Sequence, residues 1–332
     1  MPTTTCPPDL EEFVLRHTAL EQPLRCTPLP GGVSSDIYLV EGSGGRVAAK
    51  RALAQLKVAA VWHAPRERSA SEAGWLEVVG GLAPGFCPRP LGYTPDPGWL
   101  LMEYLDPVTH PVWKHHLLAG RVEPAVAREL ARRLGRVHRV TAGQPQLAQR
   151  FATDALFDAL RLDPYLRALL PEHPVVADRI EAIIDRTAGT RIALVHGDVS
   201  PKNILLAPSG PVLLDAECAW WGDPAFDVAF LLTHLVSKTA HLPARHVELA
   251  TAIEGFVADY TEHVDWEPVK KLLGRVSDLL PALVLARIDG KSPLEYLAPF
   301  ARDALRMRAL RLLGTEACDL QTSIRTLTDP LR

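Results

Sequence analysis

The 332-residue sequence lacks an excess of either charge. It contains 36 Lys and Arg against 39 Asp and Glu, and its formal net charge is −3. A protein that binds nucleic acid by neutralising phosphates needs dense basic runs, and we find none. We therefore expect no nucleic-acid partner.

Cysteine is scarce and scattered. The five cysteines are Cys6, Cys26, Cys87, Cys218 and Cys318. None belongs to a C-x-x-C pair, and their number is odd, so neither a zinc site nor a disulfide framework is indicated. We expect the thiols to be reduced, as is typical of a cytoplasmic protein.

Long uncharged apolar runs are also missing. The longest approach to one, Val228–Val236, contains His234 and is far shorter than a membrane span. Residues 1–17 carry Glu11 and Glu12 and lack the basic start and apolar block of a signal peptide. These features favour a cytoplasmic protein without a membrane partner.

What is present predicts an α+β chain without repeats or low-complexity linkers. Hydrophobic residues make up 47% and charged residues 23%, as in ordinary globular proteins. Alternating apolar residues and Gly or Pro turns predict strands in the first third, and helical spacing predominates after Asp106-Pro107. The predicted strands are Leu24–Leu29, Ile37–Glu41, Arg46–Arg51, Pro88–Tyr93, Trp99–Tyr104, Ile204–Leu206 and Val212–Leu214. The predicted helices include Asp9–Leu20, Arg66–Val79, Ala125–Val140, Ala177–Thr187 and most of Asp223–Leu313.

This order of elements predicts two lobes with a cleft between them. Residues 1–105 would form a small antiparallel-sheet lobe with one main helix, which binds a nucleotide. Residues 106–332 would form a larger, mostly helical lobe with the catalytic loop and the acceptor pocket.

The most informative stretch runs from His196-Gly197-Asp198 to Asn203, and Asp215 and Glu217 follow the next predicted strand. Phosphoryl transfer from ATP needs a carboxylate that orients and deprotonates a hydroxyl, and oxygen ligands that hold Mg²⁺. Asp198 suits the first task, and Asn203 with Asp215 suits the second. The spacing equals that of the kinase catalytic loop, in which Asn follows Asp by five positions. A lone Asp or His would more often be a cap or a packing residue.

The loop resembles that of the aminoglycoside phosphotransferase and choline kinase superfamily, which reads His-Gly-Asp-x-x-x-x-Asn followed by Asp-x-Asp or Asp-x-Glu. The resemblance implies a protein-kinase-like two-lobe fold, ATP and Mg²⁺ as cofactors, Asp198 as the base, and Asn203 and Asp215 as metal ligands. It also implies a supporting or second metal role for Glu217. The segment 221–227 resembles the family's Gly-Asp-Pro-x-x-Asp, in which Asp227 would brace the catalytic loop. We interpret His196 as an anchor of that loop.

The nucleotide side is predicted from the first lobe. Val47-Ala48-Ala49-Lys50 is close to the Val-Ala-Ile-Lys pattern of kinase strand three, so Lys50 would pair with the ATP phosphates. Glu72 best fits the carboxylate that holds Lys50, and Glu67 is the alternative. In the turn that precedes the Lys50 strand along the chain, adjacent glycines and serines would approach phosphate through their backbone and hydroxyl groups. These turn residues are Gly31, Gly32, Ser34 and Ser35.

The adenine would be read at the end of the strand 99–104. The carbonyl of Glu103 and the amide of Leu105 can bond the base edge, with Met102 facing the base. The same pattern would arise in any buried strand.

The acceptor is predicted only as a small molecule with a hydroxyl group, either a metabolite or an antibiotic. Arg287 ends an apolar helix at a position loosely similar to a sugar-contacting Arg of methylthioribose kinases, or complements the helix dipole. Trp220 and Trp221 could wall the pocket, although such aromatics are more often packed in a core. From Leu235 onward acidic and basic residues are nearly balanced, which lends no support to a polycationic acceptor.

Three alternatives stay open. The enzyme could be a sugar or amino-alcohol kinase of the methylthioribose or choline kinase type. A nucleotide-binding pseudokinase is disfavoured because base, lysine and metal ligands are all present. A protein substrate is disfavoured because the segment between Asp215 and Asp223 is too short for a long activation loop. The sequence does not indicate an oligomeric state.

Overall fold

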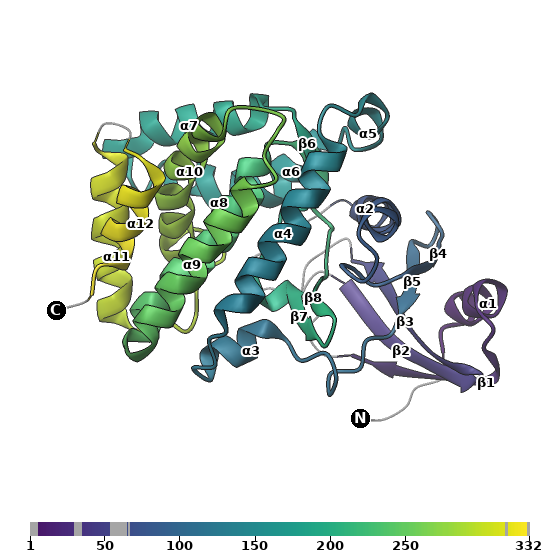
Figure 1. Cartoon of the computed structure of the whole chain (residues 1–332). Helices are drawn as coiled ribbons and strands as arrows, with labels where there is room; N and C mark the ends of the chain where they lie inside the picture. Colours follow the sequence, from purple (N-terminus) through teal and green to yellow (C-terminus); the bar gives the residue numbers. More distant parts are fainter. Residues whose placement is uncertain (1–5, 30–34, 54–64, 66, 316–317, 331–332) are drawn as a thin grey trace.

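The computed structural model describes residues 6–29, 35–53, 65, 67–315 and 318–330. A five-stranded sheet and α1 lie to one side of the molecule, and a mostly helical part lies to the other (Figure 1). The sheet is antiparallel throughout, in the order β1-β2-β3-β5-β4. Its strands are β1 (Glu21–Pro28), β2 (Ser35–Ser43), β3 (Gly45–Ala52), β4 (Pro90–Tyr93) and β5 (Trp99–Glu103).

The two faces of this sheet are covered by different helices. Side chains alternate between the faces of a strand, so neighbours such as Leu100 and Leu101 point in opposite directions. Leu101 packs with α1 (Pro8–His17), whereas Leu100 packs with α2 (Arg68–Leu82). Lys50 pairs with Leu100 across the β3–β5 ladder and therefore lies on the α2 face. This register points the Lys50 side chain toward the helical part.

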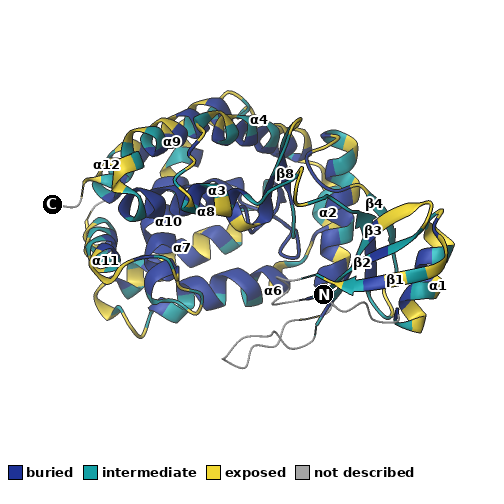
Figure 2. Cartoon of the chain, turned by 90° about the horizontal axis from the view of Figure 1, so that it is seen from below, coloured by how far each residue is buried: buried dark blue, intermediate teal, exposed yellow. Residues whose placement is uncertain are grey.

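The helical part is built around α8 (Pro224–His241). Asp223 caps this helix by accepting the N–H of Ala225 at 2.9 Å, and Pro224 occupies the first turn, as helix starts favour. Every residue of α8 from Pro224 to Ala240 is buried, and Figure 2 shows both α8 and α10 mostly dark blue. An element buried on all sides is held firmly in place.

Other elements surround α8. The helices are α3 (Trp113–Leu118), α4 (Pro124–Thr141), α5 (Pro145–Arg150), α6 (Asp154–Phe157), α7 (Ala177–Gly189), α9 (His246–Thr261), α10 (Val269–Asp289), α11 (Pro299–Leu313) and α12 (Leu320–Thr328), with a π-helical segment at Asp158–Leu166. Two short two-stranded sheets pair β6 (Ala193–Val195) with β9 (Trp220–Gly222) and β7 (Ile204–Ala207) with β8 (Gly210–Leu213). The catalytic-loop sequence lies between β6 and β7.

Most predicted elements occur within a few residues of their expected bounds. β1 begins three residues before the predicted Leu24. α1 ends at His17 instead of Leu20, since the backbone of Thr18 is extended, with φ −134° and ψ 168°. β9 was not predicted, because Trp220–Gly222 is too short to show alternation. Within the described ranges, every helix is too short or too polar to cross a bilayer. The lobe boundary at residue 105 stays a prediction.

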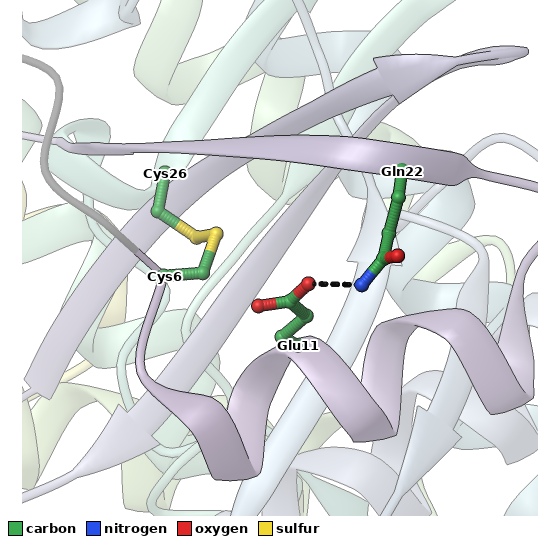
Figure 3. The surroundings of a disulfide bond; sticks show 4 residues. All are labelled: Cys6, Glu11, Gln22 and Cys26. Atoms are coloured by element: carbon green, nitrogen blue, oxygen red, sulfur yellow. Dashed lines mark hydrogen bonds between the residues drawn. A yellow bond between two sulfur atoms is a disulfide. The ribbon is translucent and has the colours of Figure 1, made fainter.

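The expectation that all five cysteines are reduced was wrong. Cys6 and Cys26 form a disulfide that joins the segment before α1 to β1 (Figure 3). Both are buried, and a hydrogen bond of 2.6 Å from Gln22 Nε2 to Glu11 Oε1 also links β1 and α1. The pairing was missed because the two cysteines meet only after α1 folds back onto the sheet. Cys87, Cys218 and Cys318 are free.

We predict that the Cys6→Ser/Cys26→Ser variant loses roughly 3 kcal/mol of unfolding free energy, since closing a loop of this length restricts the unfolded chain by about that amount. Chemical denaturation of the variant and of the Cys318→Ser control measures the difference. Thiol titration of the denatured, unreduced protein should give the three free cysteines. Five reactive thiols would contradict the bond.

Candidate active site

The catalytic loop is held by the first turn of α8. Asp227 is fully buried and accepts the backbone N–H groups of His196 and Gly197, each at 2.8 Å. His138 of α4 lies 3.2 Å from the same carboxylate and also contacts the Tyr260 hydroxyl at 2.7 Å. Hydrogen bonds from backbone amides to a buried carboxylate are strong. The loop is thereby fixed to the most buried helix of the molecule.

Gly197 is required by the loop conformation. Its φ is +79°, a region that side chains rarely adopt. A Cβ at this position would lie 2.7 Å from the carbonyl oxygen of Cys218. Only glycine can therefore make the turn between His196 and Asp198.

His196 ties the loop to the end of β8. The amide of Asp198 donates to His196 Nδ1 at 3.1 Å, so the ring proton resides on Nε2, which donates to the Leu214 carbonyl at 3.1 Å. Burial lowers the pKa of His196 and keeps the ring neutral. The ring also packs edge-on against Trp75 of α2, at 4.9 Å between centroids. These contacts are the ones expected of a residue that anchors the catalytic loop, as predicted for His196.

The Asp198 carboxylate offers one bonded and one free oxygen. Oδ2 is paired with Arg161 at 2.9 Å and Lys202 at 3.2 Å. Oδ1 is buried and has no hydrogen-bond partner among the described residues. Burial raises the pKa of Asp198, but the charges of Lys202 and Arg161 outweigh it and set the pKa below its ordinary value. A charged carboxylate with one unpaired oxygen can accept the proton of a hydroxyl group.

Arg161 was missed from the sequence. It comes from the π-helical segment and also donates from Nε to the Gly197 carbonyl at 2.5 Å. No motif marks it, because its contact with Asp198 spans 37 positions and depends on how that segment packs. π-helical turns often occur at functional sites.

A second cluster surrounds Lys50. Its ammonium lies 2.7 Å from Glu72 Oε2, 2.5 Å from Asp215 Oδ1 and 3.0 Å from Glu217 Oε1. Of the two glutamates considered for Lys50, Glu72 makes the contact. Burial opposes the charge of Lys50, yet the three carboxylates raise its pKa well above the ordinary value. Lys50 is therefore protonated.

The carboxylates of this cluster differ in exposure and in proton affinity. The Glu72 side chain is 3% exposed, and burial raises its pKa to about 7. The Asp215 side chain is 31% exposed, and although burial acts to raise its pKa, the charge of Lys50 lowers it well below the ordinary range. Asp215 also has a φ of +68°, which is strained for a residue with a Cβ. Asp215 is thus the ionised carboxylate that solvent reaches.

These residues provide oxygen atoms suited to Mg²⁺, which binds few carboxylates and keeps several waters. Ligand atoms of Glu72, Asp215 and Glu217 lie within 4.8 Å of one another. Asn203 Nδ2 donates to the Asp198 carbonyl at 3.1 Å, which turns its amide oxygen to the other side. Asn203 and Asp215 are the residues predicted to hold the ion. Their metal role stays a prediction.

Glu217 is engaged by protein donors. Its oxygens accept from the Ser35 hydroxyl at 2.6 Å and from Arg68 Nε at 3.0 Å, in addition to Lys50. Its predicted metal role would require at least one of these contacts to be exchanged. Arg68, fully buried at the start of α2, was another residue that the sequence did not reveal.

Of the remaining predicted nucleotide residues, those that the structure describes lie at the sheet or directly after it. Gly31, Gly32 and Ser34 fall outside the described residues. Ser35 starts β2 and donates to Glu217 as above. Met102 pairs with Ala48, and Glu103 ends β5, where its side chain accepts the N–H of Arg89 at 2.8 Å. Leu105 follows two residues later. The adenine-reading role of these three residues stays a prediction.

The predicted acceptor residues are placed differently. Trp220 and Trp221 are buried in β9, and Trp220 stacks on Phe157 at 3.9 Å between ring centroids. The structure thus places them in the helical core. Arg287 lies in the last turn of α10 and donates to Ser292 Oγ at 2.7 Å.

Comparison with known proteins gives a family match over most of the chain. Residues 25–272 match the model described as "Phosphotransferase enzyme family". Methylthioribose kinase of Yersinia enterocolitica is 27% identical over 263 residues, which cover 70% of this chain and 64% of that protein. Methylthioribose kinase 1 of Oryza sativa subsp. japonica is 25% identical over 232 residues, covering 60% of this chain and 53% of that protein. The chain thus spans about half to two thirds of these relatives.

Solved structures with similar coordinates include an amicoumacin kinase in complex with AMP-PNP, Ca²⁺ and Ami. Its TM-score is 0.56 at 14% identity, and the match covers 93% of this chain and 94% of that chain. A spectinomycin phosphotransferase in complex with ADP and spectinomycin has a TM-score of 0.50 at 10% identity, over 97% and 93% of the two chains. These similarities confirm the predicted kinase-like fold.

We predict that Asp227→Asn destabilises the protein by roughly 2–3 kcal/mol, because an amide cannot accept both loop N–H groups as a carboxylate does. Asp265→Asn is the matched control, since Asp265 forms a surface ion pair with Arg139 and its side chain is 53% exposed. Urea denaturation compares the two. Equal midpoints would show that Asp227 does not hold the loop.

Proposed function

Because the chain belongs to the phosphotransferase enzyme family, we propose that it is an ATP-dependent kinase that phosphorylates a hydroxyl group of a small molecule. The observation that carries this proposal is Oδ1 of Asp198, which has no hydrogen-bond partner among the described residues. It is a buried oxygen of an ionised carboxylate in the loop that also carries Asn203. Lys50 of β3 is held by Glu72 and by Asp215, the carboxylate that follows β8. Base, metal ligands and phosphate-binding lysine are the parts that phosphoryl transfer requires.

Each residue has a defined task in this reaction. Asp198 orients the acceptor hydroxyl and takes its proton as the oxygen bonds to the γ-phosphorus and the bond to the β,γ-bridging oxygen breaks. Lys50 pairs with phosphate oxygens of the donor. Asn203 and Asp215 would hold Mg²⁺, which neutralises negative charge on the phosphates when bound. Arg161 keeps Asp198 ionised and fixes its orientation.

The acceptor that we propose is a small molecule, as it is for the proteins to which the chain is similar. The curated relatives are methylthioribose kinases, and an amicoumacin kinase and a spectinomycin phosphotransferase share the fold. Between a metabolic sugar and an antibiotic, the sequence relatives favour the sugar. Against a protein acceptor, only the short β9 lies between Glu217 and Asp223, the cap of α8.

We predict that Asp198→Asn lowers turnover by about 10²- to 10⁴-fold, the usual contribution of a general base, and leaves Mg·ATP binding intact. Steady-state kinetics on any accepted substrate and calorimetric titration with Mg·ATP measure the two effects. Asp303→Asn, at a carboxylate that is 68% exposed, serves as the control. Undiminished turnover in Asp198→Asn would refute its role as the base.

We predict that Lys50→Met weakens Mg·ATP binding by at least tenfold, since it removes a phosphate contact and leaves Glu72, Asp215 and Glu217 without their shared cation. Lys271→Met, at an exposed position of α10, is the control. Calorimetric titration gives both affinities. Equal affinities in the two variants would place the nucleotide elsewhere.

A further inference from the structure

A small cavity beside the catalytic loop is lined mainly by basic residues. Its volume is about 30 Å³, and its lining includes Lys114 of α3, Lys202 of the catalytic loop, His234 and Lys238 of α8, Arg287 of α10 and Glu295. We call it the basic chamber. Four of these six residues are lysine or arginine, and one is acidic.

At the floor of the basic chamber, two basic side chains form no ion pair with any described carboxylate. Lys238 is 1% exposed, and its described contact is with the ring of Tyr296, whose centroid lies 3.5 Å from Nζ. Arg287 is 8% exposed and donates to the neutral oxygens of Ser292 and Tyr165, while its Nε has no partner within the described part of the chain. Tyr296 Oη is likewise buried and unpaired there.

The carboxylate of the lining acts on these two basic groups only through its charge and forms its ion pair with another residue. Glu295 is paired with Lys114 at the exposed mouth of the chamber. Within the described ranges, neither Lys238 nor Arg287 forms an ion pair with a carboxylate. Burying an unpaired cation costs free energy, so such a site is stable only if its charge is suppressed or a ligand supplies the anion.

The electrostatics of the floor agree with this imbalance. Burial lowers the pKa of Lys238 to about 7. The charges of Lys114 and Arg287 act in the same direction, and the charge of Glu295 acts against them. Burial, with the charges of Arg287 and Lys238, also lowers the pKa of His234, which is therefore neutral. Strongly perturbed groups that cluster in a cavity are typical of binding sites.

The basic chamber adjoins the catalytic base. Lys202 lines the chamber and also contacts Asp198 at 3.2 Å. Arg161, which holds Asp198, lies over the ring of Tyr165 at 5.6 Å, and Arg287 donates to the hydroxyl of that tyrosine at 3.4 Å. The chamber and Asp198 thus share Lys202 as a neighbour and are linked through Tyr165.

Helix α8 links the basic chamber to the catalytic loop. Phe230, His234 and Lys238 recur at a spacing of four and so share one face of the helix. Asp227, one turn before Phe230, holds the catalytic loop. The chamber floor and the catalytic loop are thus parts of one rigid scaffold.

We propose that the basic chamber binds an anionic group of the acceptor while Asp198 engages its hydroxyl, so that the substrate is an acidic hydroxyl compound. The proposal rests on the kinase function above. A cavity of this size holds about two waters, which matches a carboxylate group. Lys238 and Arg287 would repel a polycation such as an aminoglycoside. A hydroxy acid or sugar acid fits best.

A panel of acceptors tests the substrate class. Mg·ATP consumption is measured with sugar acids, with phosphorylated sugars, with neutral polyols of the same carbon skeletons, and with amino alcohols and aminoglycosides. We expect kcat/KM to be at least tenfold higher for acids than for matched polyols. Preference for phosphorylated sugars would keep the anionic site and assign its ligand as phosphate. Turnover confined to neutral or cationic acceptors would overturn the inference and leave the kinase function standing.

The variant Lys238→Met tests the site itself. We expect KM for the acidic acceptor to rise at least tenfold, with kcat within about threefold and KM for ATP within twofold. Lys271→Met should change none of these values. A rise in KM for ATP in place of KM for the acceptor would assign the chamber to the nucleotide and overturn the inference.

The melting temperature reports binding of an anion to the chamber even when that anion is not phosphorylated. Without ligand, Lys238→Met should melt roughly 2–4 °C above the wild type, because a buried unpaired cation is removed. D-gluconate or inorganic phosphate should raise the melting temperature of the wild type and not that of the variant. Equal responses of the two proteins would overturn the inference. Failure of the wild type to bind Mg·ATP would refute the kinase function separately.

Discussion

The ammonium of Lys50 is the point at which three distant parts of the chain meet. It comes from β3, Glu72 comes from α2, and Asp215 and Glu217 come from the segment after β8, all within 3.0 Å of its nitrogen. Buried carboxylates at such distances repel one another strongly, so the arrangement is stable only with the cation in place. The orientation of the sheet against the catalytic segment therefore depends on this cluster. Arg68 completes it by pairing with Glu217 from the start of α2.

The parts of the site that are local in sequence could be predicted, and the parts made by packing could not. His196, Asp198, Asn203 and Asp215 occur at a fixed spacing because one loop and one hairpin carry them. Arg161 has no such spacing, since it reaches Asp198 from a π-helical segment that precedes the loop by more than thirty residues. The fold followed from the order of strands and helices, because that order is itself written along the chain.

The expectation of reduced cysteines failed, and the interpretation of the charge balance after Leu235 stayed incomplete, for the same reason. The disulfide between Cys6 and Cys26 depends on α1 folding back onto β1, which no cysteine spacing reveals. The balanced charges after Leu235 concealed an uneven distribution in space. Lys238 and Arg287 meet at one cavity because α8 and α10 are neighbours, and of the acidic residues in that count only Glu295 belongs to the lining of the cavity. Net charge therefore says little about the ligand of a single pocket.

The complete burial of α8 has a consequence for how such an enzyme can change its acceptor. Asp227 and Lys238 are eleven positions apart, or about 16 Å along the axis at the usual rise per residue. Replacement of side chains at the Lys238 end of the helix can change which acceptor is bound, while the catalytic loop held at the Asp227 end stays as it is. A mutation that shifts the whole of α8 would instead disturb acceptor binding and the catalytic loop together. Evolution or engineering of new acceptors should thus proceed by exchange of side chains on a fixed backbone.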